Sequence, residues 1–184
     1  MSLSSSLDEI LNEWRVKHPN LSFPNFDPQS TDKPHTLILL ESPGPEVENS
    51  KIISMANNDA TARELYRLAK LAFGEGARSQ VLLWNAIPWF LKKDEKIKSG
   101  HLGKAKLLHF QLIKVVEPYI RNVVFLGRPS RDLLPFYSGV LKSCRFFGGH
   151  HTGMKAQKSL LIKENEAVFL NIKTSAAAKS ECNI

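Results

Sequence analysis

The chain has 184 residues, of which 42% are hydrophobic and 23% charged, so a disordered chain is excluded and a single domain over residues 1–184 is expected. Lysine and arginine number 25 against 18 aspartates and glutamates, and the resulting net charge of +7 favours a polyanionic partner. No apolar run approaches the ~20 residues that span a bilayer, so we expect no membrane partner.

The two cysteines, Cys144 and Cys182, are far apart in the sequence. Two thiols cannot supply a disulfide framework, a zinc ribbon or a four-cysteine iron–sulfur cluster. We therefore expect a cytoplasmic protein without a metal or cofactor of this kind. Residues 1–6 have neither the basic region nor the apolar run of a signal peptide, and we expect them to lie outside the fold.

Apolar runs of strand length alternate with stretches of helical period along the chain. Asp59 is a candidate N-cap, while Gly74 and Pro118 mark the ends of helices. The segment after Lys158 mixes both periods and stays unassigned. In chain order we predict a helix over residues 7–16, a strand over 36–40, a helix over 59–73, a strand over 80–84, a helix over 102–117, a strand over 122–126, a helix over 131–141 and a strand over 144–147.

This alternation of strands and helices predicts the architecture. Successive βαβ units give a three-layer α/β/α sandwich around a central, mostly parallel four-stranded sheet. In such sheets ligands bind beyond the carboxyl ends of the strands. We therefore expect four segments to meet at one edge of the sheet, namely residues 41–45, 85–89, 127–129 and 148–153.

Two polar side chains stand at the predicted strand ends. The amide of Asn85 can donate and accept at once, which suits the edge of a pyrimidine; the alternative is an asparagine that closes the strand end through backbone bonds. Glu41 opens the segment Glu-Ser-Pro-Gly-Pro, which lacks the spaced glycines of a phosphate-binding loop. This segment either holds a carboxylate and a rigid backbone against a flat substrate or is a plain turn.

Two histidines, His150 and His151, follow two glycines and precede Thr152 and Gly153. A histidine on such a loop can reach a ligand. A metal site needs further ligands at suitable spacing, so we predict no metal site here. A metal hydrolase that uses both histidines is kept as a further possibility.

A lysine-rich stretch begins at Lys92 and Lys93, beside Trp89 and Phe90. Basic residues interleaved with aromatic rings suit a nucleic-acid backbone. Two acidic residues interrupt the run, so a solvated loop is the alternative interpretation.

Taken in order, these motifs resemble the uracil-DNA glycosylase superfamily over residues 36–155. Each motif is placed where the family has one, at a strand end or helix start. The motifs are residues 39–45, similar to the family's first motif; residues 57–62, which lead into a helix as in a bacterial subgroup; residues 81–89, similar to the strand with the base-reading asparagine; residues 123–127, similar to the next strand; and residues 149–153, where the His-Pro-Ser-Pro motif belongs.

The resemblance implies a metal-independent monomeric enzyme that flips uracil, or a related damaged base, out of DNA and hydrolyses its N-glycosidic bond. It implies that Asn85 reads the base, that His150 donates a hydrogen bond to uracil O2 as the base leaves, and that Glu41 orients water. The other residues it implies are Ser42, Pro43, Gly44, Ile52 and Trp89 for the base, and Met154, Lys155, Lys158, Lys92 and Lys93 for DNA.

The histidine motif departs from the family's pattern, because His151 and Gly153 stand where the family has prolines. The alternative function is therefore a catalytically weak or inactive nucleic-acid-binding member of the same fold.

Overall fold

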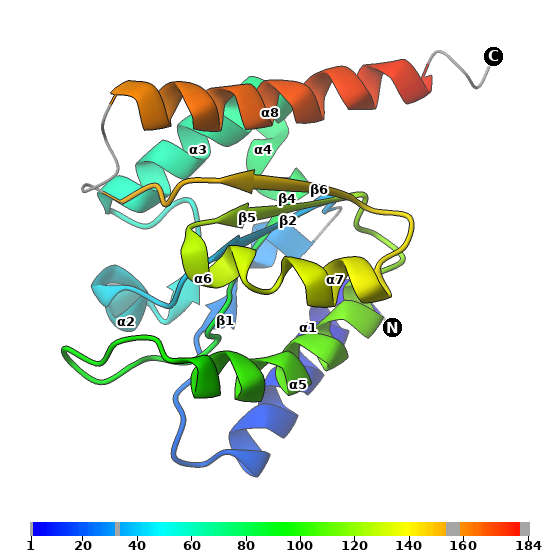
Figure 1. Ribbon diagram of the computed structural model, residues 1–184. Helices are drawn as coiled ribbons and strands as arrows, with labels where there is room; N and C mark the ends of the chain where they lie inside the picture. Colours follow the sequence, from blue (N-terminus) through cyan, green and yellow to red (C-terminus); the bar gives the residue numbers. More distant parts are fainter. Residues whose placement is uncertain (1, 32–33, 154–158, 181–184) are drawn as a thin grey trace.

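The computed structural model describes residues 2–31, 34–153 and 159–180. A four-stranded parallel sheet lies at its centre, in the order β4-β2-β5-β6. Helices cover both faces of this sheet (Figure 1). The predicted three-layer α/β/α sandwich is therefore confirmed. The strands are β2 (Thr36–Leu40), β4 (Val81–Asn85), β5 (Asn122–Leu126) and β6 (Arg145–Gly149).

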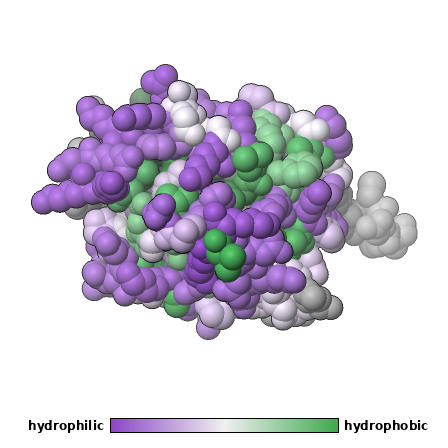
Figure 2. All heavy atoms as spheres, turned by 90° about the horizontal axis from the view of Figure 1, so that it is seen from below, coloured by the Kyte–Doolittle hydropathy of each residue, from purple (hydrophilic) through white to green (hydrophobic). Residues whose placement is uncertain are grey.

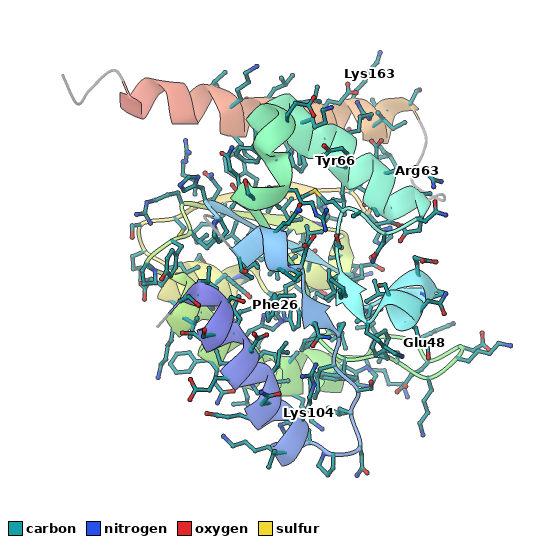
Figure 3. The ribbon with its side chains drawn as sticks, turned by 180° about the vertical axis from the view of Figure 1, so that it is seen from behind. Phe26, Glu48, Arg63, Tyr66, Lys104 and Lys163 are labelled. Atoms are coloured by element: carbon teal, nitrogen blue, oxygen red, sulfur yellow. The ribbon has the colours of Figure 1, made fainter. Side chains whose placement is uncertain are left out.

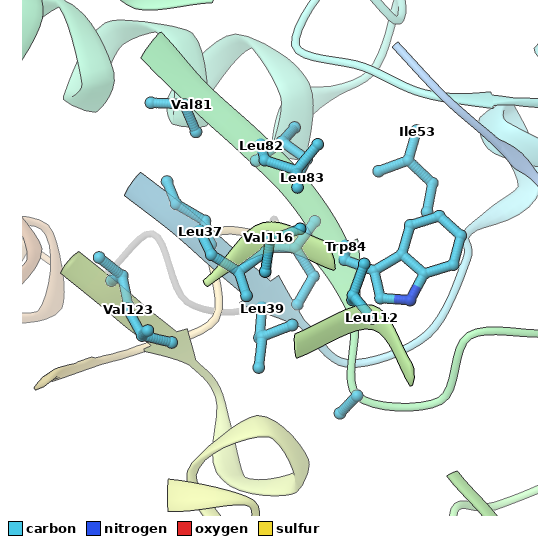
Figure 4. Close-up of a cluster of buried hydrophobic side chains, with 14 of the residues drawn as sticks. Leu37, Leu39, Ile53, Val81, Leu82, Leu83, Trp84, Leu112, Val116 and Val123 are labelled. Carbon is cyan, nitrogen blue, oxygen red and sulfur yellow. The ribbon is translucent and has the colours of Figure 1, made fainter. Parts of the chain in front are cut away.

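Every residue of β2, β4 and β5 is buried, as continuous apolar runs predict for strands covered on both faces. Figure 4 shows leucines and valines of these strands packed with Leu112 and Val116 of α5 (Ser99–Val116). Strand β4 ends one residue later than predicted and β6 ends two residues later, because Leu40 pairs with Asn85 and Leu126 pairs with Gly149.

One face of the sheet is covered by α3 (Ala60–Phe73), α4 (Ala77–Gln80) and α8 (Ser159–Ser180) (Figure 1). The carboxylate of Asp59 caps α3 by accepting the Ala62 N–H at 2.8 Å, and the helix ends at Gly74, where φ is +64°. Helix α8 occupies the segment that the sequence left unassigned. Its buried side chains, Asn165, Phe169 and Ile172, recur at helical spacing.

The other face is covered by α5, by α6 (Arg128–Arg131) and by α7 (Leu134–Val140), with α1 (Leu3–Lys17) packed on α5. The predicted helix over residues 131–141 is thus divided. A continuous helix would require Pro135 to donate an N–H that it lacks and would bring its ring against the Arg131 carbonyl, so the chain ends one helix and starts another.

The expectation that residues 1–6 lie outside the fold was wrong from Leu3 onwards. Ser2 caps α1 by accepting the Ser5 N–H at 3.2 Å, and the side chains of Leu3 and Leu7 are buried. The helix is tied to α5 by a hydrogen bond from the Trp14 indole N–H to Gln111. Serines next to the N-terminus indicated a tail, but their function here is to begin a helix.

A smaller substructure lies beside β4. It contains β1 (Asn25–Phe26), η1 (Pro28–Thr31), α2 (Pro45–Ser50) and β3 (Ile52–Ile53), with β1 parallel to β3. Phe26, labelled in Figure 3, stacks on Trp84 of β4 with ring centroids 3.9 Å apart. Buried Asp27 accepts hydrogen bonds from Ser54 at 2.5 Å and from Arg78 at 2.7 Å, which joins this substructure to α4.

Seen from below, the molecule presents a mostly hydrophilic face on which hydrophobic side chains are interspersed (Figure 2). The large exposed hydrophobic side chains of α1 and α5 are Val16, Leu107 and Phe110. Among the described helices, none is long and apolar enough to cross a membrane.

Candidate active site

The main cavity of the described residues lies beyond the carboxyl ends of the four parallel strands and has a volume of about 930 Å³. Each of the four predicted segments contributes to its lining: residues 41–45 after β2, Asn85 at the end of β4, Gly127 and Arg128 after β5, and the histidine loop after β6. The N-terminal part of α3 forms a further wall. The parallel order of the strands therefore brings together residues that are more than 100 positions apart in the sequence.

Asn85 is a buried polar residue of this cavity, with 1% of its surface exposed. Its side-chain nitrogen Nδ2 has no hydrogen-bond partner among the described residues. The strand end is closed instead by backbone bonds, from Ala86 N–H to Leu40 O at 2.8 Å and from Ile87 N–H to Glu41 O at 2.9 Å. The side chain is therefore not used to cap the strand, and its Nδ2 donor is available to a ligand in the cavity.

The turn after Asn85 is fixed from behind by His109 of α5, which is fully buried. Its Nε2–H donates to Ala86 O at 3.0 Å, and its Nδ1 accepts from the Tyr137 hydroxyl at 2.6 Å. Desolvation lowers the pKa of His109 to about 4, so the ring stays neutral at physiological pH. This hydrogen bond to the Ala86 carbonyl was not predicted, because a histidine within an apolar helical stripe gives no indication of its partner.

Glu41 lies against Gly127, which has a φ of +98°. A Cβ at Gly127 would come within 2.6 Å of Glu41 Oε1, so both the backbone conformation and the space require glycine there. No described residue donates a hydrogen bond to the Glu41 carboxylate, which is partly exposed at the cavity wall. The carboxylate is therefore available to water or to a ligand.

The two histidines line the cavity but have different partners. His150 Nε2 lies 2.5 Å from Glu164 Oε2 of α8. His151 Nδ1 accepts the Gly153 N–H at 2.8 Å, so in its neutral form the ring carries its proton on Nε2. A Cβ at Gly153 would come within 2.8 Å of this ring. The Nε2–H of His151 therefore has no partner among the described residues, whereas His150 already contacts a carboxylate.

The other predicted base-binding residues divide into two groups. Ser42, Pro43 and Gly44 line the cavity, whereas Ile52 and Trp89 do not. Ile53 lines it in place of its neighbour. Trp89 is buried against Phe23 and His101, and its ring lies 5.8 Å from the Lys104 ammonium. The described lining contains no phenylalanine, tyrosine or tryptophan, so apart from the two imidazole rings a base bound here would pack against aliphatic and proline side chains.

The predicted DNA-binding lysines also divide. Lys92 and Lys93 are exposed on the loop between β4 and α5, outside the cavity lining but on the side of the molecule to which the strand ends point (Figure 1). Met154, Lys155 and Lys158 lie outside the described residues. Arg128 and Arg131 also line the cavity, and neither was among the predicted site residues, although Arg128 lies in the predicted segment 127–129. Arg128 could have been recognised from its position in the sequence, because it directly follows Gly127 after the end of β5.

No group of three or more metal-ligating side chains occurs within residues 2–31, 34–153 and 159–180. Glu164 contacts His150, but the described side chains around the two histidines do not form such a group. The described cavity offers a buried amide donor, an imidazole Nε2–H donor, a partly exposed carboxylate and two arginines.

No protein-family model and no curated protein matches this sequence. Among solved structures, the fold is similar to that of a protein from Methanosarcina acetivorans described as a "putative Uracil DNA glycosylase", which was solved in solution by NMR. The TM-score is 0.57 at 19% sequence identity, and the match covers 80% of this chain and 96% of that one. At this identity the likeness concerns the fold alone, an α/β domain with a central four-stranded parallel sheet.

Proposed function

We propose that this protein hydrolyses the N-glycosidic bond of uracil, or of a related deaminated base, flipped out of DNA. The observation that carries the proposal is Asn85, whose buried Nδ2 has no described partner and faces a cavity at the strand ends. An unsatisfied buried donor costs about 1–3 kcal/mol. A ligand that accepts this hydrogen bond removes the cost, which explains why a folded protein retains an asparagine there.

Uracil matches this amide. The Asn85 Nδ2 would donate to O4 of the base, and Oδ1 would accept N3–H. Cytosine presents the reverse pattern, so its binding would leave two buried polar pairs mismatched. The resemblance of residues 81–89 to a base-reading strand supports the same role.

The leaving base develops negative charge on O2 as the C1′–N1 bond breaks and both electrons of that bond go to the base. A neutral imidazole that donates from Nε2 stabilises this charge without transferring its proton. The hydrogen bond from Gly153 to Nδ1 supports His151 in this role. The motif alignment predicted His150, whose Nε2 contacts Glu164, so we propose His151 as the donor to O2.

Glu41 would act on the sugar side of the bond. The sugar becomes positively charged as the base leaves, and a nearby carboxylate stabilises that charge and orients the water that attacks C1′. The oxygen of this water bonds to C1′ and one of its protons leaves to the carboxylate, which returns it to solvent. The base leaves as its anion and takes up a proton from solvent, so the products are the free base and an abasic site.

Arg128 and Arg131 would bind the phosphates on either side of the flipped nucleotide, because neither guanidinium has an ion-pair partner among the described residues. Lys92 and Lys93 would extend this basic surface along the strand, and Lys155 and Lys158, outside the described residues, are proposed as further phosphate contacts. The reaction as proposed needs no metal or other cofactor and a single copy of the chain.

The test is an oligonucleotide with one deoxyuridine, incubated with the enzyme in EDTA and then cleaved with alkali. We expect a break at the uracil from the wild-type chain, formed at least about 10²-fold more slowly by Asn85→Leu, which keeps the size of the side chain. Binding without cleavage would support a nucleic-acid-binding protein instead, and cleavage that EDTA abolishes would support a metal hydrolase on the two histidines.

A further inference from the structure

The histidine loop is held in place by α8, a helix whose structure the sequence did not predict. Asn165 of α8 is buried, with 3% of its surface exposed. Its Oδ1 accepts the His150 N–H at 2.8 Å and its Nδ2 donates to His150 O at 3.2 Å. One side chain therefore satisfies both backbone polar groups of the residue that precedes His151.

The chain leaves room for this contact. A Cβ at Gly149 would come within 2.7 Å of Asn165 Oδ1, so glycine at the end of β6 allows the amide to approach the loop backbone. The neighbouring Glu164 contacts the ring of His150. Two consecutive residues of α8 thus hold the backbone and the side chain of one loop residue.

The helix itself is anchored away from the loop. Phe169 and Ile172 are fully buried. Arg67 of α3 contacts Glu166 of α8 at 2.7 Å and Glu64 of its own helix at 2.8 Å. Because Thr61, at the start of α3, lines the same cavity, α8 sets the histidine loop relative to a wall of the site.

We propose that Asn165 is a positioning residue: through the backbone of His150 it sets the orientation of His151 in the cavity, and α8 is thereby part of the site. The proposal rests on the proposed function for its activity readout only. The ring of His151 and its hydrogen bond from Gly153 can be observed without any reaction.

The decisive variant is Asn165→Leu, which keeps the approximate volume and removes both hydrogen bonds to His150. Asn165→Asp keeps the acceptor for the His150 N–H and loses the donor to His150 O, so we expect an intermediate effect. Ile172→Val is the control for packing of α8, and Thr174→Ala, at an exposed position of the same helix, is the control for the helix surface.

The first measurement is the ¹⁵N spectrum of the histidine rings near neutral pH. We expect one Nε2–H tautomer of His151 in the wild type and in both controls, and a mixture of tautomers in Asn165→Leu. The second is single-turnover excision with saturating enzyme in EDTA. We expect Asn165→Leu to slow the chemical step by roughly 10–100-fold, the scale of a misplaced catalytic group, while the Kd for DNA changes by less than about twofold.

Wild-type tautomer and rate in Asn165→Leu would overturn the proposal. A loss in Ile172→Val as large as in Asn165→Leu would also overturn it, because packing of α8 alone would then explain the effect. If Asn165→Leu does not fold, the ¹⁵N spectra of Asn165→Asp and Gly149→Ala test the proposal instead. Gly149→Ala acts because its added Cβ would force the Asn165 amide away from the loop. If the wild type excises no base, the proposed function fails, and the ring spectrum still decides the role of Asn165.

Discussion

The ends of β4 and β6 both contribute a polar side chain to the cavity, but they are held by different means. Asn85 ends β4, an edge strand whose residues are all buried, and the turn after it is held by a fully buried His109–Tyr137 pair. His151 follows β6, the opposite edge strand, which is buried only at its last residue, and its loop is held in place by side chains of the peripheral helix α8. The proposed base-reading residue is therefore held by the core, whereas the proposed donor to the leaving base depends on a contact outside the core.

The largest expected effect concerns the two histidines. His151→Ala should slow the chemical step by ~10²–10³-fold, the scale of losing one oxyanion donor, whereas His150→Ala should cost less than about tenfold. Single-turnover rates in EDTA with saturating enzyme separate this step from DNA binding. A more damaging His150→Ala would return the donor role to His150, and recovery with added metal would favour the hydrolase.

At the end of β4, Asn85→Leu should lower excision by about 10²-fold or more, because the base then loses two hydrogen bonds in a buried site. The same change removes an unpaired buried donor, so the free energy of unfolding should stay equal or rise. Urea unfolding and excision at subsaturating substrate measure the two quantities. A variant that is destabilised and still active would place Asn85 in the fold rather than in the site.

The buried pair behind Asn85 should be visible in the pH dependence of stability. The pKa of His109 is about 4 in the folded chain, against 6.5 for an unperturbed histidine. Between these values the unfolded chain binds more protons, so the free energy of unfolding should fall as pH falls, by up to about 1.4 kcal/mol per pH unit.

His109→Gln keeps a donor for Ala86 O but does not titrate, so it should remove this part of the pH slope. The measurement is urea unfolding at several pH values between 4 and 7. Equal slopes in the wild type and the variant would show that the pKa of His109 is the same in the folded and unfolded chains.

The smallest expected effect concerns the arginines between the two strand ends. If Arg131 binds a phosphate, Arg131→Gln should lower the slope of log affinity against log salt by roughly one unit. Lys142→Gln, an exposed change outside the cavity lining, is the matched control and should leave the slope unchanged. Equal slopes in all three proteins would assign the phosphate contacts to other residues.

The sequence by itself determined the sheet and the place of the site. A continuous apolar run predicts a strand that is buried on both faces, and this pattern is local. Parallel strands bring their carboxyl ends to one edge of the sheet. Glu41, Asn85 and the histidine loop could therefore be placed at that edge from local patterns alone. Helix α3 was predicted for a similar reason, because its cap and its apolar stripe are both local.

Only the tertiary structure decided which polar atoms are free. The choice between His150 and His151 depends on their contacts with Glu164 and with the Gly153 N–H. The turn after Asn85 is held by His109, which bonds to Ala86, 23 positions earlier, and is itself bonded to Tyr137. Hydrogen bonds between distant residues leave no periodic trace in a sequence. For the same reason Trp89, an aromatic residue next to a strand end, was predicted to bind a base and instead packs against Phe23 in the core.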